Sequence, residues 1–252
     1  MIVSEVMTTD LVTVTPDDSL SHVANLFRQH QFHHLPVVRA THELKTRGQQ
    51  PITRHPWPVL EGLITSHDID LAVAVGIENS SNGEQHPWEE RRVADVMNRS
   101  IMRVTPTTSV AAAAQLLVEQ GLNCLPVVEY EESFNTEQVA EQEEYIFLVG
   151  LLTRSDLLIE LARTLGAFEP GINLHIPLRT GNPTSLAKML LLAAELHVKI
   201  ESVIVAPPKQ GVPHAATVRI GTINPAPLLV RLQQAGISYS YADFQLEGDT
   251  HG

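Results

Sequence analysis

The chain has 252 residues, with 17 Lys or Arg against 29 Asp or Glu, so its net charge is −12. This charge repels polyanions at long range, which excludes general DNA or RNA binding but not a local basic site for a small anion. Hydrophobic residues make up 43 % of the chain, which excludes wholesale disorder. At roughly 100 to 200 residues per domain, two domains or three small ones are expected.

Targeting and redox features are few. The chain has one cysteine, Cys124, so neither an internal disulfide nor a Cys-rich zinc module is expected. The first residues, Met1–Met7, lack the basic and apolar runs of a signal peptide. No apolar stretch reaches the length of about 18 residues that spans a bilayer. We therefore expect an acidic, soluble protein of the cytoplasm that does not enter a membrane.

Four short motifs occur twice in the same order. The first three pairs lie 90 residues apart and the last pair 88. The pairs are Val3–Met7 and Val93–Met97, Val14–Pro16 and Val104–Pro106, Leu35–Val38 and Leu125–Val128, and Gly62–Asp68 and Gly150–Asp156. Four ordered matches with one small shift are hard to obtain by chance, so they indicate a duplicated structural unit.

Each repeat is predicted to fold in the order helix, strand, strand, helix. In the first repeat, Thr15 and Pro16 favour a helix start, and an apolar stripe from Leu20 to Phe27 has helical spacing. A short strand follows at Leu35–Val38, then a loop, a strand ending at Thr65, and a helix from Ser66 to about Gly76. In the second repeat the corresponding features are Thr105 and Pro106, the stripe Val110–Leu117, the strand Leu125–Val128, and a helix from about Ser155 to Gly166. Gly121 ends the first helix of that repeat in the left-handed conformation, and Gln31 at the same place is a weaker cap.

Both strand-to-helix corners combine hydroxyls, free backbone N–H groups and a carboxylate in the first helical turn. Free N–H groups at a helix N-terminus bind phosphate, and a carboxylate accepts hydrogen bonds from the two ribose hydroxyls. Asp68 and Asp156 are therefore candidates for ribose, and Thr65, Thr153 and Arg154 for ribose or phosphate. The same residue types also suit an ordinary helix cap. Their duplication favours ligand binding.

The pattern resembles the CBS domain, and two copies in tandem resemble a CBS pair, or Bateman module, from Met1 to about Gly166. The resemblance implies two motifs packed through their sheets as a pseudo-two-fold pair, with two clefts for adenosine-containing ligands such as AMP, ADP, ATP or S-adenosylmethionine. It places the base against Thr13, Thr15, His33, His34 and Leu35 in one set, and against Arg103, Thr105, Asn123, Cys124 and Leu125 in the other. Leu35 and Leu125 also suit the core of a strand. Because the two sets differ, we expect unequal affinities.

No residue pattern points to catalysis or to a metal. His33 and His34 are consecutive on a predicted strand and so point to opposite faces, which favours scattered histidines over metal ligands. The sequence has no His-Glu-x-x-His, Gly-x-Ser-x-Gly, Walker or Gly-x-Gly-x-x-Gly motif. Cys124 is expected to be a buried thiol rather than a nucleophile. We expect a protein that is not an enzyme and has no cofactor or metal.

Two insertions and one linker separate these elements. The insertion 39–61 is slightly basic and the insertion 129–149 strongly acidic, and both are typical of solvated loops. An alternative is that they meet across a dimer. The Asn-, Ser- and Gly-rich stretch Glu78–Gln85 is typical of a linker.

The last third of the chain has a different pattern. Predicted strands at Asn173–Leu178, Ser202–Val205, Ala216–Ile220 and Ser238–Phe244 alternate with helices from Thr184 or Ser185 to about His197 and from Pro225 to Ala235. The order βαββαβ is a ferredoxin-like split motif and resembles an ACT domain. This resemblance implies pairing through the sheets, and an effector site near the turn Arg179–Pro183.

The predicted fold is mixed α and β: residues 1–78 and 79–168 are two CBS motifs, and 171–247 an ACT-like domain. This order resembles the acetoin-utilisation-type CBS–ACT proteins. The resemblance implies a cytoplasmic, dimeric regulatory protein that senses an adenine nucleotide or a related adenosyl ligand. The alternative is a scaffold that dimerises and binds a protein partner without a nucleotide.

Overall fold

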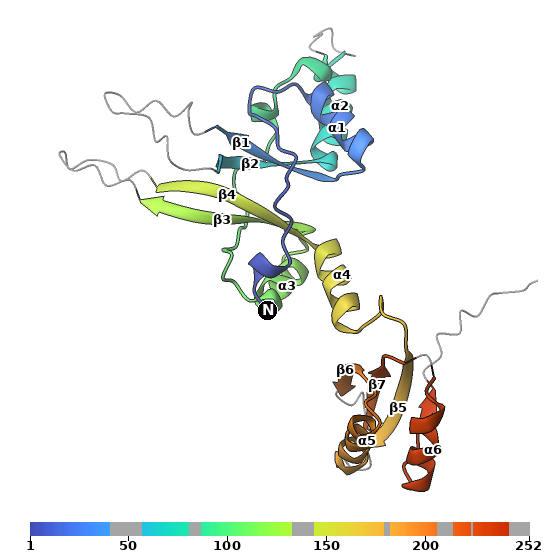
Figure 1. The fold of residues 1–252 in the computed structure, drawn as a ribbon. Coiled ribbons are helices and arrows are strands. Elements are labelled where there is room, and N and C mark those ends of the chain that lie inside the picture. Colours follow the sequence, from blue (N-terminus) through green and yellow to red (C-terminus); the bar gives the residue numbers. More distant parts are fainter. Residues whose placement is uncertain are drawn as a thin grey trace, which may run out of the picture. The chain divides into compact units, whose positions relative to one another are not determined.

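The computed structural model describes residues 1–40, 57–80, 87–132, 144–178, 182–205, 214–222 and 224–241. The chain forms two compact units, Met1–Leu157 and Leu158–Gly252 (Figure 1). Among the described residues, no helix has both the length and the apolar character needed to cross a bilayer. Most of both predicted insertion loops, and part of the predicted linker, fall outside the described residues.

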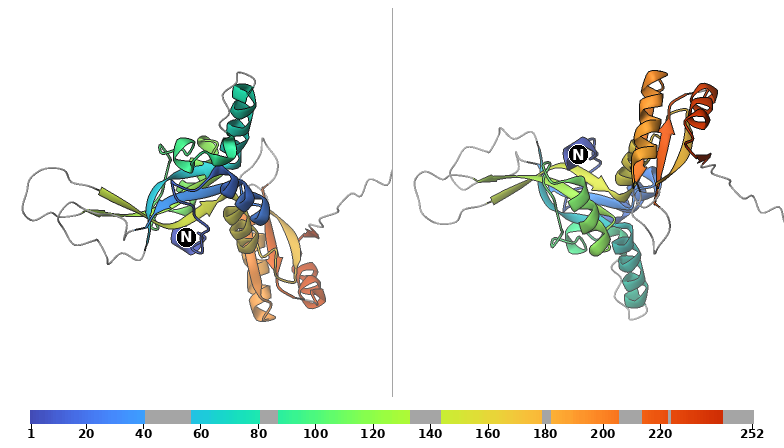
Figure 2. Two further views of the ribbon diagram at one scale, coloured as in Figure 1. Left: turned by 90° about the horizontal axis from the view of Figure 1, so that it is seen from above. Right: turned by 90° about the horizontal axis from the view of Figure 1, so that it is seen from below.

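One four-stranded antiparallel sheet runs through the first unit, in the order β1-β2-β4-β3 (Figure 1). Figure 2 shows this unit from two further sides. Its strands are β1 (His34–Arg39), β2 (Val59–Thr65), β3 (Cys124–Glu132) and β4 (Glu144–Thr153). The pairs β1–β2 and β3–β4 have the same register and the same irregularity, which lies after Val37 in one and after Val127 in the other. This agreement confirms that the sequence repeat is a structural repeat.

Four helices accompany this sheet, α1 (Leu20–His30), α2 (Ser66–Ser80), α3 (Val110–Glu119) and α4 (Arg154–Thr164). The 3₁₀ turns are η1 (Val3–Glu5), η3 (Trp88–Glu90) and η4 (Val93–Asp95). The predicted apolar stripe of α1 is buried at Leu20, Val23 and Phe27. Gln31 and Gly121 both have positive φ, 57° and 65°, as expected for left-handed helix ends.

The predicted helix starts at Thr15 and Thr105 are wrong. Ser19 and Ser109 cap α1 and α3, because their side chains accept hydrogen bonds from the N–H groups of His22 and Ala112. Thr15 instead opens a turn in which its N–H donates to the Asp18 carboxylate at 2.6 Å. The carbonyls of this turn bond residues of η4, so tertiary pairing holds its backbone outside the helix. Likewise, α2 continues past Gly76 to Ser80.

The segment that begins each repeat packs on the other repeat. The N–H of Val3 donates to the Thr108 carbonyl, and Val3 is fully buried in the core of the second repeat. Figure 1 shows this N-terminal segment beside α3. In the same way, the N–H of Val93 donates to the Asp18 carbonyl, and Val93 is fully buried in the core of the first repeat. The two repeats therefore exchange their first turns.

A small apolar cluster joins the two repeats at the centre of the sheet. It consists of Val38, Leu60, Val128 and Leu148, with Leu11 and Ile101 packed against it. Each residue from one repeat has its counterpart from the other, so the cluster has an approximate two-fold symmetry. Burial of these side chains stabilises the pairing of the repeats.

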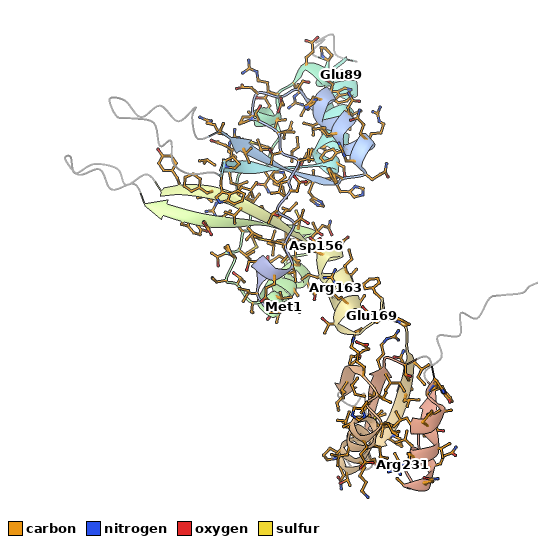
Figure 3. The ribbon with its side chains drawn as sticks, viewed as in Figure 1. Met1, Glu89, Asp156, Arg163, Glu169 and Arg231 are labelled. Atoms are coloured by element: carbon orange, nitrogen blue, oxygen red, sulfur yellow. The ribbon has the colours of Figure 1, made fainter. Side chains whose placement is uncertain are left out.

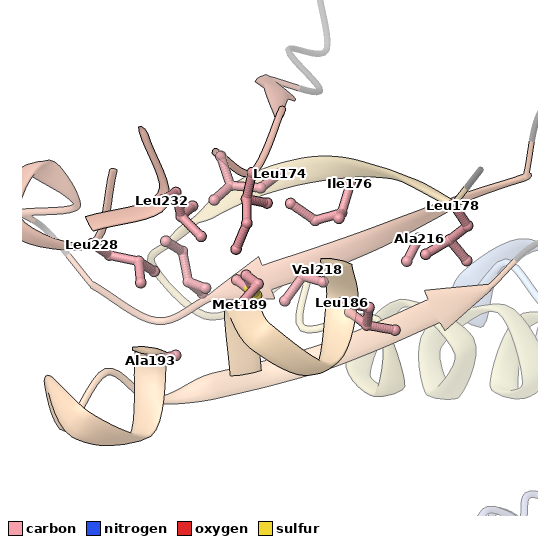
Figure 4. Packing of buried hydrophobic residues seen from close by; sticks show 12 residues of the cluster. Leu174, Ile176, Leu178, Leu186, Met189, Ala193, Ala216, Val218, Leu228 and Leu232 are labelled. Atoms are coloured by element: carbon pink, nitrogen blue, oxygen red, sulfur yellow. The ribbon is translucent and has the colours of Figure 1, made fainter. Parts of the chain in front are cut away.

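The second unit has the element order βαββαβ and a sheet in the order β6-β7-β5-β8. Its elements are β5 (Ile172–Leu178), α5 (Thr184–Glu195), β6 (Ile200–Val205), β7 (His214–Ile220), α6 (Ala226–Gln234) and β8 (Ser240–Tyr241). One apolar core joins the two helices to the sheet, with Leu174, Met189, Val218 and Leu232 fully buried (Figure 4). The predicted ferredoxin-like order is confirmed.

Two local details of this unit differ from expectation. Pro183, rather than Thr184 or Ser185, is the N-cap residue of α5, and Oδ1 of the preceding Asn182 accepts from the Thr184 N–H at 2.9 Å. The helix ends at Glu195, and His197 follows with a positive φ of 55°. Part of the predicted effector turn, residues 179–181, lies outside the described residues.

Candidate ligand-binding clefts

The first predicted corner joins β2 to α2. The Thr65 N–H and hydroxyl both donate to Oδ2 of Asp68 at 2.7 Å, and the Asp68 N–H donates to the Thr65 hydroxyl at 3.3 Å. This reciprocal arrangement is a capping box that satisfies two free donors of the helix N-terminus. The cap engages one carboxylate oxygen, so Oδ1 of the half-buried Asp68 remains as an acceptor for another partner.

The second corner joins β4 to α4 and has the same geometry. Oδ2 of Asp156 accepts from the Thr153 N–H at 2.7 Å and from its hydroxyl at 2.8 Å. Oδ1 of Asp156 also faces the Thr8 hydroxyl at 3.5 Å, which is long for a hydrogen bond. Figure 3 shows Asp156 at the start of α4. The structure thus contains both helix caps, and of the two capping aspartates Asp68 lines a cleft whereas Asp156 does not.

A cleft lies at each Thr–Asp corner, and each of these two clefts takes residues from both repeats. Cleft 1 has a volume of about 550 Å³ and is lined by Thr8, Asp10, Leu11, Val12, Gln31, Phe32, His33, His34, Leu35, Pro36, Asn123, Leu151, Thr153, Arg154 and Ser155. Cleft 2 has a volume of about 270 Å³ and is lined by His34, Leu63, Thr65, Asp68, Asn98, Ser100, Ile101, Met102, Gly121, Leu122, Asn123, Cys124 and Pro126. The corner of one repeat therefore faces the residues that precede the first strand of the other.

The predicted base-contacting residues fall into three groups. His34 and Asn123 line both clefts, His33 and Leu35 line cleft 1, and Cys124 lines cleft 2. Leu35 and Leu125 are 1 % and 0 % exposed, so their side chains belong to the core, and Leu125 lines neither cleft. The other four predicted residues, Thr13, Thr15, Arg103 and Thr105, also line neither cleft.

These four residues lie elsewhere because the chain around Val14 and Val104 pairs with the sheet. Val14 forms a parallel bridge with Val37, and Val104 forms one with Val127. The N–H of Thr105 donates to the Thr108 hydroxyl, in a turn equivalent to that of Thr15. Arg103 donates from Nε to the Tyr130 hydroxyl at 3.2 Å and lies over the ring of that tyrosine.

Sequence reasoning missed the residues that follow each exchanged turn. Thr8–Val12 contributes four residues to cleft 1, and Asn98–Met102 contributes four to cleft 2. The two stretches lie 90 residues apart and directly after the repeated Val-Met motif. That offset was a usable signal, although it did not reveal that each stretch meets the corner of the other repeat.

Burial changes two titratable groups of the clefts. The pKa of His34 is lowered from its ordinary value of 6.5, mainly by burial and also by neighbouring His33, while Asp68 opposes the shift. His34 is therefore neutral at pH 7 and offers one donor and one acceptor. Burial raises the pKa of Cys124 to about 12, so this thiol is protonated and a poor nucleophile.

Within the ranges that the structure describes, no group of three or more His, Cys, Asp or Glu side chains is placed to hold a metal ion.

Comparisons with known proteins identify the repeats. The family model of the CBS domain matches residues 3–48 and 93–163, so the N-terminal part of the chain consists of tandem CBS domains. The matched residues end before β5. The CBS domain-containing protein YhcV of Bacillus subtilis is 28 % identical over 127 residues, which are 50 % of this chain and 72 % of YhcV.

Two solved structures are similar to part of this chain. One is an acetoin utilization protein (AcuB) from Vibrio cholerae, with 22 % identity, a TM-score of 0.45, and coverage of 68 % of this chain and 98 % of that one. The other is CBSX2 from Arabidopsis thaliana in complex with AMP, with 23 % identity, a TM-score of 0.43, and coverage of 64 % and 95 %.

Proposed function

Because the N-terminal part of the chain consists of tandem CBS domains, we propose that this is a non-catalytic regulatory protein that binds an adenosine-containing ligand in clefts 1 and 2. The ligand is AMP, ADP, ATP or a related adenosyl compound such as S-adenosylmethionine. The observation that carries the proposal is the composition of the clefts. Each combines a capped helix start from one repeat with apolar and amide-bearing residues from the other.

Each part of the ligand has a chemical counterpart. Oδ1 of Asp68 or Asp156 accepts hydrogen bonds from ribose hydroxyls, and Thr65 or Thr153 lies beside ribose or phosphate. The base enters the space next to His34 and Asn123, where apolar side chains and polar groups meet. His33, Leu35 and Cys124 complete this predicted set. Such a mixture of apolar lining and a few oriented polar groups is typical of small-molecule sites.

The ligand would regulate by favouring one arrangement of the two repeats. Since both repeats contribute to each cleft, a bound ligand bridges them and stabilises the arrangement that fits it. A ligand moves such an equilibrium only by its difference in affinity for the two states. We propose that the change in arrangement is transmitted through α4, which starts at the Thr153–Asp156 corner and continues into the second unit. The ACT-like domain of that unit would respond to it.

The residues that follow α4 are hydrogen-bonded to the sheet of the second unit. Ser202 donates from its hydroxyl to the Leu165 carbonyl at 3.1 Å, and Arg219 donates to the Glu169 carbonyl at 2.5 Å. Gly166 has a positive φ of 71°, and a Cβ there would lie 2.8 Å from the Arg219 side chain. A movement of α4 would therefore reach β6 and β7 through direct bonds.

Homodimerisation is the second part of the proposal. Leu158, Ile159 and Leu161 of α4 are 65 %, 49 % and 54 % exposed, which gives this helix an apolar surface suited to a partner. The same surface supports the alternative, a scaffold that binds a protein partner without a nucleotide. Ligand binding separates the two, because the scaffold needs none.

The test is calorimetric titration of the full chain with AMP, ADP, ATP, NAD and S-adenosylmethionine. The double variant Asp68→Asn/Asp156→Asn keeps a cap acceptor at both corners and removes the charge that strengthens hydrogen bonds to ribose. We expect its affinity to fall at least tenfold, a loss of about 1.4 kcal/mol. Asp18→Asn is the matched control, because Asp18 also caps a backbone N–H but lines neither cleft.

Two outcomes would contradict the proposal. If none of these compounds binds the wild-type chain, the scaffold alternative stands. If a compound binds and the double variant binds it equally well, the two aspartates do not hold the ribose.

A further inference from the structure

The two corners are alike in backbone geometry and differ in the residue that opens the helix. The N–H of Ser66 donates to the His33 carbonyl at 3.0 Å, and the N–H of Arg154 donates to the Asn123 carbonyl at the same distance. The positions 66 and 154 are thus equivalent. Position 66 carries a short hydroxyl beside Thr65 of cleft 2, and position 154 carries the guanidinium of Arg154, which lines cleft 1.

This difference gives the clefts different charges. Arg154 lines cleft 1, where Asp10 is the acidic lining residue. Its Nη2 donates to the Leu117 carbonyl at 3.2 Å, which engages one of its five N–H donors. Cleft 2 is lined by Asp68, and none of the described residues that line it is Lys or Arg. Arg103, which the sequence predicted for this site, contacts Tyr130 and does not line cleft 2.

The capping aspartates of the two corners also differ in how accessible they are to a ligand. Oδ1 of Asp156 already faces the Thr8 hydroxyl at 3.5 Å, and Asp156 does not line cleft 1. Asp68 lines cleft 2, where the residue equivalent to Thr8 is Asn98. The side-chain oxygen of Asn98 accepts from the Ser100 N–H at 2.9 Å. The carboxylate of cleft 2 is therefore the more open of the two.

The volumes of the two clefts also favour a larger ligand in cleft 1. Cleft 1 has about 550 Å³ and cleft 2 about 270 Å³. The larger cleft has room for a phosphate beyond the nucleoside, and it is also the one with the guanidinium. A helix N-terminus capped by a Thr–Asp pair adjoins each cleft, so this feature does not distinguish between ligands.

We infer that the two clefts select adenosine ligands by charge. Cleft 1 takes a phosphate-bearing nucleotide through Arg154, and cleft 2 takes an adenosine compound without phosphate, either neutral or cationic. A phosphate in cleft 2 would lose water beside the Asp68 carboxylate with no cation to replace it, which is unfavourable. The inference rests on the proposed function, because it assigns ligand classes to the clefts proposed there.

The experiment exchanges the two residues in the full chain. AMP and adenosine are titrated calorimetrically into the wild type, Arg154→Ser, Ser66→Arg and Arg154→Lys. We expect each wild-type chain to bind one equivalent of AMP tightly, in cleft 1, and any AMP in cleft 2 more weakly. Arg154→Ser lowers AMP affinity at least tenfold and changes adenosine affinity less than threefold. Ser66→Arg adds a second equivalent of AMP, and Arg154→Lys retains most AMP affinity because it keeps the charge.

Single aspartate variants assign each ligand to its cleft. Asp156→Asn should weaken AMP binding and Asp68→Asn should weaken adenosine binding, each at least fivefold. Circular dichroism and urea unfolding confirm that every variant is folded, since Arg154→Ser also removes the bond to Leu117.

The inference is overturned if wild type and Arg154→Ser bind AMP equally well, or if Asp68→Asn rather than Asp156→Asn removes AMP binding. Failure of the proposed function has a different signature: neither AMP nor adenosine binds the wild-type chain.

Discussion

His34 stands at the first position of β1 and lines both clefts. Its position follows from strand geometry, because Leu35 next to it points into the core and is 1 % exposed. Burial holds its pKa below 6.5, so folding favours the neutral imidazole. A residue that lines two sites is placed to couple protonation to the occupancy of both.

This shift predicts a loss of stability in mild acid. The pKa of His34 is lower in the folded chain than in the unfolded chain, so as the pH falls below 6.5 the unfolded chain takes up the proton first. The stabilising contribution is present above pH 6.5 and is lost as the pH falls through the lower, folded pKa. We expect His34→Gln to lower the slope of unfolding free energy against pH between pH 7.5 and 5.5, measured by urea unfolding.

His22→Gln serves as the control, because His22 is an exposed histidine of α1 that lines neither cleft. It should keep the slope of the wild type. An unchanged slope in His34→Gln would show that protonation of His34 does not affect folding.

At the scale of the elements, β2 and β4 each contain a glycine against which the exchanged segment of the other repeat lies. A Cβ at Gly62 would lie 2.7 Å from the Asn98 carbonyl oxygen, which the Leu63 N–H holds by a 2.9 Å bond. A Cβ at Gly150 would lie 2.5 Å from Sδ of Met7. The hydrogen-bonded carbonyl of Asn98 cannot easily move away from an added methyl group, whereas the flexible side chain of Met7 can adopt another rotamer. The repeated glycines thus allow a close approach between chain segments.

The two glycines should therefore differ in their tolerance of alanine. We expect Gly62→Ala to destabilise the chain by about 2 kcal/mol, in the range of overpacked cores, and Gly150→Ala by about 1 kcal/mol or less. Urea unfolding of both variants and the wild type measures the difference. Equal losses, or a larger loss in Gly150→Ala, would contradict the role of the Asn98 carbonyl.

Prediction of the elements succeeded where the signal was local. The apolar stripe of α1 reports which face of the helix is buried, and the structure buries Leu20, Val23 and Phe27 as expected. Prediction of the helix starts failed at Thr15. Its local signal, Thr-Pro before an apolar stripe, is shared by a helix cap and a turn, and the bonds from the turn to Val93 and Ala94 decide between them.

At the scale of the whole molecule, the two repeats are interdependent because they exchange their first turns. Val3 is 0 % exposed among second-repeat residues, and Val93 is 0 % exposed among first-repeat residues. Neither repeat therefore has a complete core from its own residues.

This exchange predicts crossed effects of two matched variants. Val3→Ala and Val93→Ala should each cost about 2 kcal/mol of unfolding free energy, as for other truncations of buried side chains. Hydrogen exchange should show the larger loss of protection in β3 and β4 for Val3→Ala, and in β1 and β2 for Val93→Ala. A loss confined to the repeat that carries the substitution would rule out the exchange.

The duplicated motifs and the periodicity of apolar residues were enough to predict two structural repeats, the two Thr–Asp corners and a third region with the order βαββαβ. These features depend on neighbours along the chain, which a sequence displays directly. The crossed assembly of the clefts and the contribution of Thr8 and Asn98 depend on contacts between the two repeats, such as those of Thr8 with Asp156 and of Asn98 with Leu63. Such contacts arise from the joint packing of both repeats, because only there does the exchanged turn of one repeat complete the core of the other.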